Sequence, residues 1–214
     1  EHLVVQDIFL TETATYADVI FPASAWPEKN GTATNTNRQV QMGRKALDAP
    51  GAAKEDWWIT NELGKRMGLD WSYEHPSEIY EEMSKTMPSL NNISWDRLEN
   101  ENSVTYPSRS PTTPGDEIVF GDKFPNESGR GKFVPASVTS PNEVPDEEFE
   151  MILTTGRQLE HWHTGAMTRK ASNLDALEPE ATVSISPNEI LKKNMKPGDK
   201  IKVSTRRGTV NIRV

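Results

Sequence analysis

The residue types best suited to chemistry lie in one segment, Thr155–Gly165, which reads Thr-Gly-Arg-Gln-Leu-Glu-His-Trp-His-Thr-Gly. Arg157 follows Gly156, which has no side chain to block access, and a guanidinium can fork onto a phosphate. His161 and His163 are two residues apart, so on an extended chain they share a face. Two donors beside an arginine favour a pyrophosphate ligand. The alternative is a strand-loop whose tryptophan packs and whose histidines are solvated.

A metal site is a second interpretation of His161 and His163, and the composition argues against it. The chain has 4 His and no Cys, and no third ligand is apparent near this pair. We therefore expect no metal-binding residue. The absence of Cys also excludes disulfides, thiolate ligation and iron–sulfur ligation by these residues.

A second candidate lies near the start of the chain, where Gln6, Asp7 and Thr11 follow an apolar run. Ligands of open α/β sheets bind at the carboxyl ends of the strands. A carboxylate there can accept hydrogen bonds from a ribose or a guanine edge, and a threonine hydroxyl can hold a phosphate. Alternatively, Asp7 and Thr11 merely cap a short helix.

A third candidate comprises Glu28, Gly31 and Asn35, within residues 24–51. This segment has little periodicity, so we expect a long ordered loop, and such loops usually have a function. Glycine lets a ligand approach the backbone. An ordinary surface loop with turn residues is the alternative.

Two weaker features have simple interpretations. Arg206 and Arg207 lie at a predicted hairpin turn and are typical of a solvated turn. Trp57 and Trp58 favour core packing over a stacking platform. No Ser/His/Asp grouping, P-loop or G-x-G-x-x-G motif is present, so we expect no catalytic residue in these 214 residues.

The elements that must position the first candidates follow a βαβ-like pattern. Residues 3–5 and 17–22 are typical of buried strands, and a short helix is predicted to begin at Thr11 between them. Amphipathic patterns predict helices over 56–68, ended by Gly68, and over 77–87, begun by a polar cap at Ser77.

The second half predicts a different architecture. Residues 107–147 are rich in Pro, Ser, Asn, Gly and Asp, which is typical of a linker or a surface-wrapping segment. A new domain is expected from about residue 148. We predict for it strands at 151–154 and 182–185, a short helix opening at Ser186-Pro187, a turn at 196–199, and a hairpin formed by 200–205 and 209–214. These elements indicate a β-barrel with small helices.

Length and charge set the broad class. A chain of 214 residues holds one large or two small domains. The net charge of −8 gives no general attraction to nucleic acid or anionic membrane. No apolar run approaches 18 residues and no signal peptide is visible, so a cytoplasmic location and no membrane partner are expected. Both ends fall in strand-like runs, which indicates a piece of a longer polypeptide.

The motifs resemble a known family. Residues 5–14, 17–28 and 31–35 closely resemble the molybdopterin oxidoreductase, or DMSO reductase, superfamily. Residues 153–157 with 161–169 look like the start of that family's C-terminal dinucleotide-binding domain. Together they are most similar to the catalytic α subunit of cytoplasmic, NAD-dependent formate dehydrogenases, of which this would be a C-terminal fragment.

The resemblance implies an α/β fold and a cofactor. Residues 1–135 would be the end of a Rossmann-like parallel-sheet domain plus a linker, and residues 148–214 the first part of a double-psi β-barrel domain. The family carries two molybdopterin guanine dinucleotides on one molybdenum or tungsten. The resemblance also implies the cofactor-binding residues: Asp7 and Thr11 at a guanosine end, Gly31 and Asp56 nearby, and Arg157, Gln158, His161 and His163, with the backbone of Thr155 and Gly156, at the pterin and pyrophosphate.

The activity implied by the resemblance is oxidation of formate to carbon dioxide. Electrons would pass through iron–sulfur clusters to flavin- and NAD-binding β and γ subunits. The family's metal ligand (Cys or selenocysteine), catalytic His and Arg, and cluster cysteines lie upstream, so the 214 residues alone should be inactive. Two alternatives stay open: another superfamily member such as a nitrate reductase, and a non-catalytic module that binds a nucleotide or a partner subunit.

Overall fold

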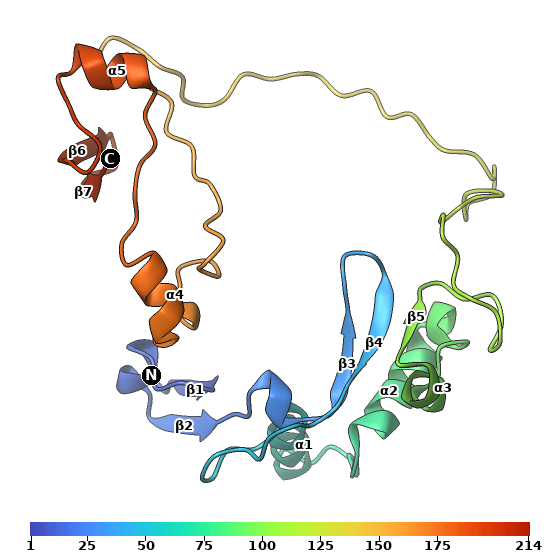
Figure 1. Ribbon diagram of the computed structural model, residues 1–214. Coiled ribbons are helices and arrows are strands. Elements are labelled where there is room, and N and C mark those ends of the chain that lie inside the picture. Colours follow the sequence, from blue (N-terminus) through green and yellow to red (C-terminus); the bar gives the residue numbers. More distant parts are fainter. The chain divides into compact units, whose positions relative to one another are not determined.

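The computed structural model describes all 214 residues and divides into two compact units, Glu1–Val134 and Pro135–Val214 (Figure 1). Helices accompany three small sheets of two, three and two strands. The predicted mixed α/β class is therefore confirmed. The finer description, a Rossmann-like sheet followed by a double-psi barrel, needs larger sheets than these and stays a prediction. None of the helices has the length and apolar character needed to cross a membrane.

The first sheet forms the predicted strand–helix–strand unit, but its strands are not buried as predicted, with Val4 46% and Ile20 39% exposed. Strand β1 (Val4–Asp7) pairs in parallel with β2 (Val19–Pro22). The connection between them contains a single 3-10 turn, η1 (Thr13–Tyr16). The helical turn starts two residues after Thr11, the predicted start. Parallel pairing leaves the carboxyl ends of both strands at one edge.

The predicted loop over residues 24–51 contains a β-hairpin, so that prediction is corrected. A helical turn, η2 (Trp26–Glu28), precedes β3 (Gly31–Thr34), which pairs antiparallel with β4 (Gln39–Gly43). The strands are short and carry many threonines and glutamines. They therefore lack the apolar alternation from which a half-buried strand is predicted.

Side chains close the turn of this hairpin. The Asn35 carboxamide accepts a hydrogen bond from the Gln39 backbone N–H and donates one to the Gln39 side-chain oxygen, both at 3.0 Å. Arg38 adopts a left-handed conformation with φ of 61°. Strand β5 (Ser103–Thr105) pairs with the other edge of β4. Asn35 therefore serves as a turn residue, as its simpler interpretation predicts.

The two predicted helices of this unit are confirmed. Helix α1 (Asp56–Arg66) ends two residues before Gly68, which has φ of 87°. Helix α2 (Pro76–Thr86) is capped by His75, whose Nδ1 accepts a hydrogen bond from the Ser77 N–H at 3.2 Å. The predicted cap at Ser77 is wrong because Pro76 already occupies the first helical position, which suits a residue without an N–H.

The hydrophobic core lies on the three-stranded sheet. A further helix, α3 (Trp95–Glu101), packs with α2 beside β5 (Figure 1). The Tyr80 hydroxyl donates to the Ile93 carbonyl at 2.8 Å inside this core. The buried core residues come from β4, β5, α2, α3 and the turn between the two helices: Val40, Tyr80, Leu90, Ile93, Trp95, Leu98 and Val104.

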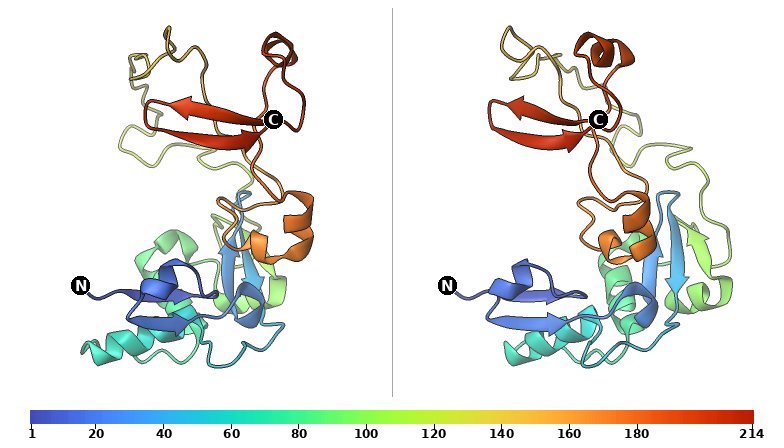
Figure 2. Two further views of the ribbon diagram at one scale, coloured as in Figure 1. Left: turned by 90° about the vertical axis from the view of Figure 1, so that its left-hand side faces the viewer. Right: turned by 60° about the vertical axis from the view of Figure 1, so that its left-hand side comes forward.

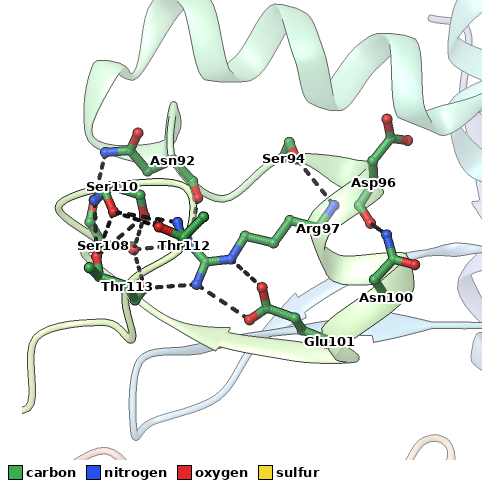
Figure 3. A network of polar contacts seen from close by, with 10 residues as sticks. All are labelled: Asn92, Ser94, Asp96, Arg97, Asn100, Glu101, Ser108, Ser110, Thr112 and Thr113. Carbon is green, nitrogen blue, oxygen red and sulfur yellow. Dashed lines mark hydrogen bonds and ion pairs between the residues drawn. The ribbon is translucent and has the colours of Figure 1, made fainter.

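The predicted linker over residues 107–147 begins as a folded segment. Buried Arg97 of α3 donates to the carbonyls of Ser110 and Thr113 and to the Ser108 hydroxyl, at 2.8–3.1 Å (Figure 3). This network fastens the start of the segment to the helix. Residues 131–148 are exposed throughout, as a linker predicts.

The second unit has short elements. Helical turn η4 (Thr168–Lys170) leads into α4 (Ser172–Leu177), and α5 (Pro187–Lys192) follows. Strands β6 (Lys200–Thr205) and β7 (Gly208–Arg213) form an antiparallel hairpin, visible as a ribbon in Figure 2. The predicted hairpin is confirmed. The predicted helix is also confirmed, with the Ser186 hydroxyl accepting from the Glu189 N–H at 3.4 Å.

Two strands predicted for this unit do not form. Residues 151–154 contain no strand and their side chains are exposed, including Ile152 at 79%. Residues 182–185 contribute only one parallel bridge, between Thr182 and Arg213. A short apolar run becomes a strand only where a neighbour satisfies its backbone groups. This unit supplies no such partner to residues 151–154.

Candidate functional site

Three segments converge at the carboxyl ends of β1 and β2. The Ala23 N–H donates to the Asp7 carbonyl at 3.0 Å. The Lys54 N–H donates to the Pro22 carbonyl at 3.0 Å, and Lys54 accepts from the Ser24 N–H at 2.9 Å. The chain before α1 therefore runs alongside the end of β2. Open α/β sheets bind ligands at such an edge.

Asp7 and Thr11 both make local hydrogen bonds at this edge. One carboxylate oxygen of Asp7 accepts from the Phe9 N–H at 3.0 Å. The Thr11 hydroxyl accepts from the Ala14 N–H at 3.3 Å. The capping interpretation therefore describes what both side chains do in this chain. The second Asp7 oxygen accepts no hydrogen bond from the chain, and a cofactor contact for either residue stays a prediction.

Asp56, the first residue of α1, is the centre of a polar cluster. One of its oxygens accepts from the Gln6 carboxamide at 2.7 Å, and the other accepts from the Lys29 ammonium. Lys29 also donates to the Ser24 carbonyl at 3.0 Å. Partial burial alone would raise the pKa of Asp56, but the hydrogen bonds from Lys29 and Gln6 outweigh it and lower that pKa. The carboxylate is therefore held ionised between two donors.

Beside this cluster lie one buried hydroxyl without a partner and one glycine that faces open space. Ser24 is 1% exposed, and its hydroxyl has no hydrogen-bond partner in the chain. A Cβ built onto Gly31 would meet no atom within 4 Å. Glu28 is already used, because its carboxylate accepts from the Ala25 N–H at 2.8 Å. Ser24 lies within residues 17–28, which carry the family resemblance, but was not predicted as a site residue, and Lys29 lies outside the resembling segments.

Residues 155–158 of the second unit are exposed. The Arg157 guanidinium makes no hydrogen bond or ion pair with the chain, and a Cβ built onto Gly156 would meet open space. Gln158 makes one long hydrogen bond, at 3.4 Å, to the Glu160 carboxylate. The backbone of Thr155 lies outside any strand. These groups are accessible to a ligand, and their predicted cofactor contacts stay predictions.

His161 has both ring nitrogens occupied by the chain. Nε2 lies 2.7 Å from the Glu178 carbonyl, and Nδ1 lies 3.1 Å from the Thr168 hydroxyl. A carbonyl can only accept, so Nε2 carries a proton and donates it. The Thr168 hydroxyl also accepts from the Trp162 N–H at 3.2 Å. His161 therefore links the two ends of the loop over residues 161–178.

His163 points elsewhere. Its φ is 52°, so the backbone turns between the two histidines and they do not share the face of an extended strand. The expectation of a shared face is wrong for that reason. The His163 ring is exposed and lies edge-on to the Trp162 ring, with centroids 4.8 Å apart. The structure gathers no group of three or more His, Asp or Glu side chains suited to a metal ion.

Arg206 and Arg207 are exposed, as the prediction of a solvated turn requires, and they are also ion-paired. Glu143 accepts from Arg206 at 2.7 Å and from Arg207 at 2.5 Å, and Asp146 accepts from Arg206. Arg206 also lies over the Phe149 ring, 4.6 Å from its centroid. The hairpin turn thus binds the acidic segment that precedes the second predicted domain.

Trp57 and Trp58 do not form part of the main core. The Trp57 indole donates to the Glu55 carboxylate. Trp58 is 40% exposed and lies under the Lys54 ammonium, 5.5 Å from the ring centroid. It lines an open groove of about 400 Å³ together with Ile59 of α1. The prediction of core packing is therefore wrong for Trp58.

Both ends of the chain match known families. Residues 1–66 match the family described as molybdopterin oxidoreductase. Residues 151–214 match the family described as molydopterin dinucleotide binding domain.

Relatives match over nearly the whole chain. The α subunit of F420-dependent formate dehydrogenase 2 of Methanococcus maripaludis is 43% identical over 213 residues, which is 99% of this chain and 31% of that protein. The α subunit of the F420-dependent formate dehydrogenase of Methanocaldococcus jannaschii is 40% identical over 215 residues, 100% of this chain and 32% of that protein. The chain thus spans about a third of the length of these relatives.

A solved structure shares the fold. The acetylene hydratase from Pelobacter acetylenicus matches with a TM-score of 0.66 at 20% sequence identity, covering 100% of this chain and 31% of that one. At this identity the likeness concerns the arrangement of the backbone alone.

Proposed function

We propose that this chain binds molybdopterin guanine dinucleotide in an enzyme that oxidises formate, because residues 1–66 match the molybdopterin oxidoreductase family and residues 151–214 match the molydopterin dinucleotide binding domain family. The observation that carries the proposal is the 43% identity to a formate dehydrogenase α subunit over 99% of the chain. The cofactor would carry molybdenum or tungsten and would supply the two-electron redox chemistry.

The residues of the first unit fit a guanosine. Asp7 keeps one carboxylate oxygen without a donor, which suits a ribose hydroxyl or a guanine N–H. The unpaired Ser24 hydroxyl is an orphaned polar atom of the kind that a ligand or a water satisfies. Open space at Gly31 admits a ligand close to the backbone. We assign the guanosine to this edge, with Thr11 holding the turn beside it.

The residues of the second unit fit the pterin and pyrophosphate. Arg157 has a free guanidinium, Gln158 a weakly engaged carboxamide and His163 an exposed imidazole. These are donors, and a pyrophosphate needs donors. The backbone groups of Thr155 and Gly156 lie next to them in the sequence. His161 holds the loop and contributes less directly.

The electron acceptor is the open part of the proposal. The family resemblance implies NAD, reached through iron–sulfur clusters and flavin-binding subunits. Two relatives are F420-dependent enzymes by name. We propose that additional subunits carry the site of the electron acceptor. Comparing the reduction of NAD with that of F420 identifies the acceptor. A location in the cytoplasm belongs to the same proposal.

The test uses the complete protein that contains this chain. Its metal content and the GMP released by acid hydrolysis are measured, followed by formate-dependent reduction of a viologen dye, NAD or F420. We expect both guanine nucleotide and formate oxidation. Dye-linked nitrate reduction without formate oxidation would support the nitrate reductase alternative. Nucleotide binding with neither activity and no metal would support the non-catalytic module.

A further inference from the structure

The first turn of α2 is capped by a titratable side chain. The residue before the helix, His75, is extended, with φ of −145° and ψ of 148°. Its Nδ1 accepts a hydrogen bond from the Ser77 N–H at 3.2 Å and lies 2.9 Å from the Ser77 hydroxyl. An N–H can only donate, so Nδ1 carries no proton and the proton of the neutral ring is on Nε2. His75 therefore caps α2 only in its neutral form.

The His75 ring packs against the core on one side and reaches solvent on the other. It lies edge-on to the Trp95 ring at 81°, with centroids 5.4 Å apart, and Trp95 is 7% exposed. Trp95 in turn lies edge-on to Tyr80 of α2, whose hydroxyl donates to the Ile93 carbonyl. His75 itself is exposed, so protons of the solvent reach it. The cap thus lies where α2 meets α3.

A proton on Nδ1 would remove the acceptor from this cap. An imidazolium has two N–H donors and no acceptor, so the Ser77 N–H would lose its partner. The ring could stay in place by donating to the Ser77 hydroxyl, but the amide would gain nothing from that contact. The helix dipole also disfavours a cation at the start of a helix. Histidine is the side chain that ordinarily changes its charge between about pH 5 and pH 8.

Glu78 supplies the other half of the cap. Its carboxylate accepts from the Glu74 N–H at 2.7 Å and from the His75 N–H at 3.4 Å. Glutamate carboxylates ordinarily stay ionised down to about pH 4.3, so these two bonds persist through the range in which a histidine takes up a proton. The Ser77 N–H is the amide of this turn that depends on His75.

The charged groups at this end of the two helices are acidic. They are the carboxylates of Glu74 and Glu78 beside α2 and that of Asp96 in the first turn of α3. Arg97, the cation of α3, donates to residues 108–113 instead (Figure 3). Lys85, the cation of α2, lies in the last turn of that helix. Neither helix therefore places a cation beside the ring that would oppose its proton.

We propose that His75 makes the start of α2 sensitive to pH, with the first turn held while the imidazole is neutral and loosened when it is protonated. The sign follows from the role of Nδ1 as an acceptor. The contribution of the cap is complete above the ordinary histidine range and is lost as pH falls through that range. The inference concerns the stability of α2, and it does not depend on the proposed cofactor or activity.

The test is hydrogen–deuterium exchange of the complete protein that contains this chain, at about pH 7.5 and about pH 5.5, on either side of the ordinary histidine value. Protection factors are compared, so that the intrinsic pH dependence of exchange cancels. In peptides that span the start of α2, wild-type protection should fall about fivefold at the lower pH, the effect of losing one N-cap hydrogen bond. His75→Asn, a cap that does not titrate, should give equal protection at both pH values. His75→Ala, without a cap, should give the low protection at both.

Helix α3 provides the matched control in the same experiment. Its cap is the Ser94 hydroxyl, which accepts from the Arg97 N–H at 3.1 Å and does not titrate in this range. Protection of α3 should therefore be equal at the two pH values. His75→Ser, a second cap that does not titrate, replaces His75→Asn if that variant does not fold.

Four results would overturn the inference. Equal protection of wild-type α2 at both pH values would show that its start does not respond to pH. The same loss in His75→Asn as in the wild type would assign the response to another group. Wild-type protection in His75→Ala at the higher pH would show that the ring does not stabilise the turn. A loss in α3 as large as that in α2 would indicate a general effect of acid on the protein.

Discussion

Replacing Arg97 by methionine tests how the segment after β5 is held. The Arg97 side chain is 7% exposed and is surrounded by oxygen atoms. It donates to the Glu101 carboxylate and to the Asn92 carbonyl (Figure 3). Methionine fills a similar volume without donors. The change therefore removes hydrogen bonds while it largely keeps the packing.

The expected loss of stability comes from the oxygen atoms that lose Arg97 as a hydrogen-bond donor. Glu101 is 47% exposed and returns to water at little cost. The Ser108 hydroxyl lies 2.9 Å from the Ser110 carbonyl and 3.0 Å from the Thr113 carbonyl, so its single proton remains as a donor for one of them. The Asn92 carbonyl loses its donor. A part-buried oxygen without a donor and the loss of several charge-assisted bonds together amount to about 3 kcal/mol.

Arg44 provides the matched control because it binds the same helix from outside. It pairs with Glu99 of α3 at 3.1 Å, and its side chain is 47% exposed. Arg44→Met should cost at most about 1 kcal/mol. Urea denaturation followed by tryptophan fluorescence, to which buried Trp95 contributes, measures the stability of both variants. If Arg97→Met destabilises the chain by no more than Arg44→Met does, the hydrogen bonds of Arg97 do not hold this segment and the reasoning fails.

Three other predictions concern single sites. Gly64→Ala should destabilise α1 by about 1–3 kcal/mol in thermal unfolding, because a Cβ there would lie 2.1 Å from the Trp71 ring. His161→Ala should speed proteolysis of the loop over residues 161–178, because the hydrogen bonds that join residue 161 to Thr168 and to the Glu178 carbonyl are lost; unchanged cleavage would contradict this. Hydrogen bonds from Arg207 and Arg206 lower the pKa of Glu143, so the contact stabilises the folded state above the ordinary glutamate pKa and is lost as pH falls through the lowered value. NMR titration of Glu143 should show that lowered midpoint, and Arg207→Gln should move it upward.

Elements with strong local signals were predictable. Helix α5 has a proline at its first position and a serine cap, and both features act within one turn. The β6–β7 hairpin alternates polar and apolar residues on either side of Gly208, so its register follows from local sequence. The hairpin formed by β3 and β4 lacks that alternation. Its stability depends on β5, which pairs from about 60 residues away, and no local pattern contains that information.

The residue types of the candidate site could be predicted from the sequence. Which of these side chains bind the protein itself, and which stay available to a ligand, could not. Asp7 and Thr11 follow a strand, and Arg157 follows an accessible glycine, so their chemistry is visible in the sequence. Whether a polar side chain faces a ligand or the protein depends on partners distant in sequence. Glu178 lies 17 residues from His161 and occupies its Nε2. Lys29 meets Asp56 across 27 residues, which no motif spacing indicates.

The position of the core explains why the predicted cofactor residues are so accessible. The buried cluster lies on β4, β5, α2 and α3, and no predicted cofactor residue belongs to it. Residues 1–22 and 155–165 instead depend on turns, short ladders and side-chain hydrogen bonds. Surface loops held in this way can present backbone and side-chain groups to a large ligand without opening a hydrophobic core. A ligand bound to either segment would supply contacts that the segment does not make for itself, so ligand binding should stabilise that segment far more than it stabilises the core.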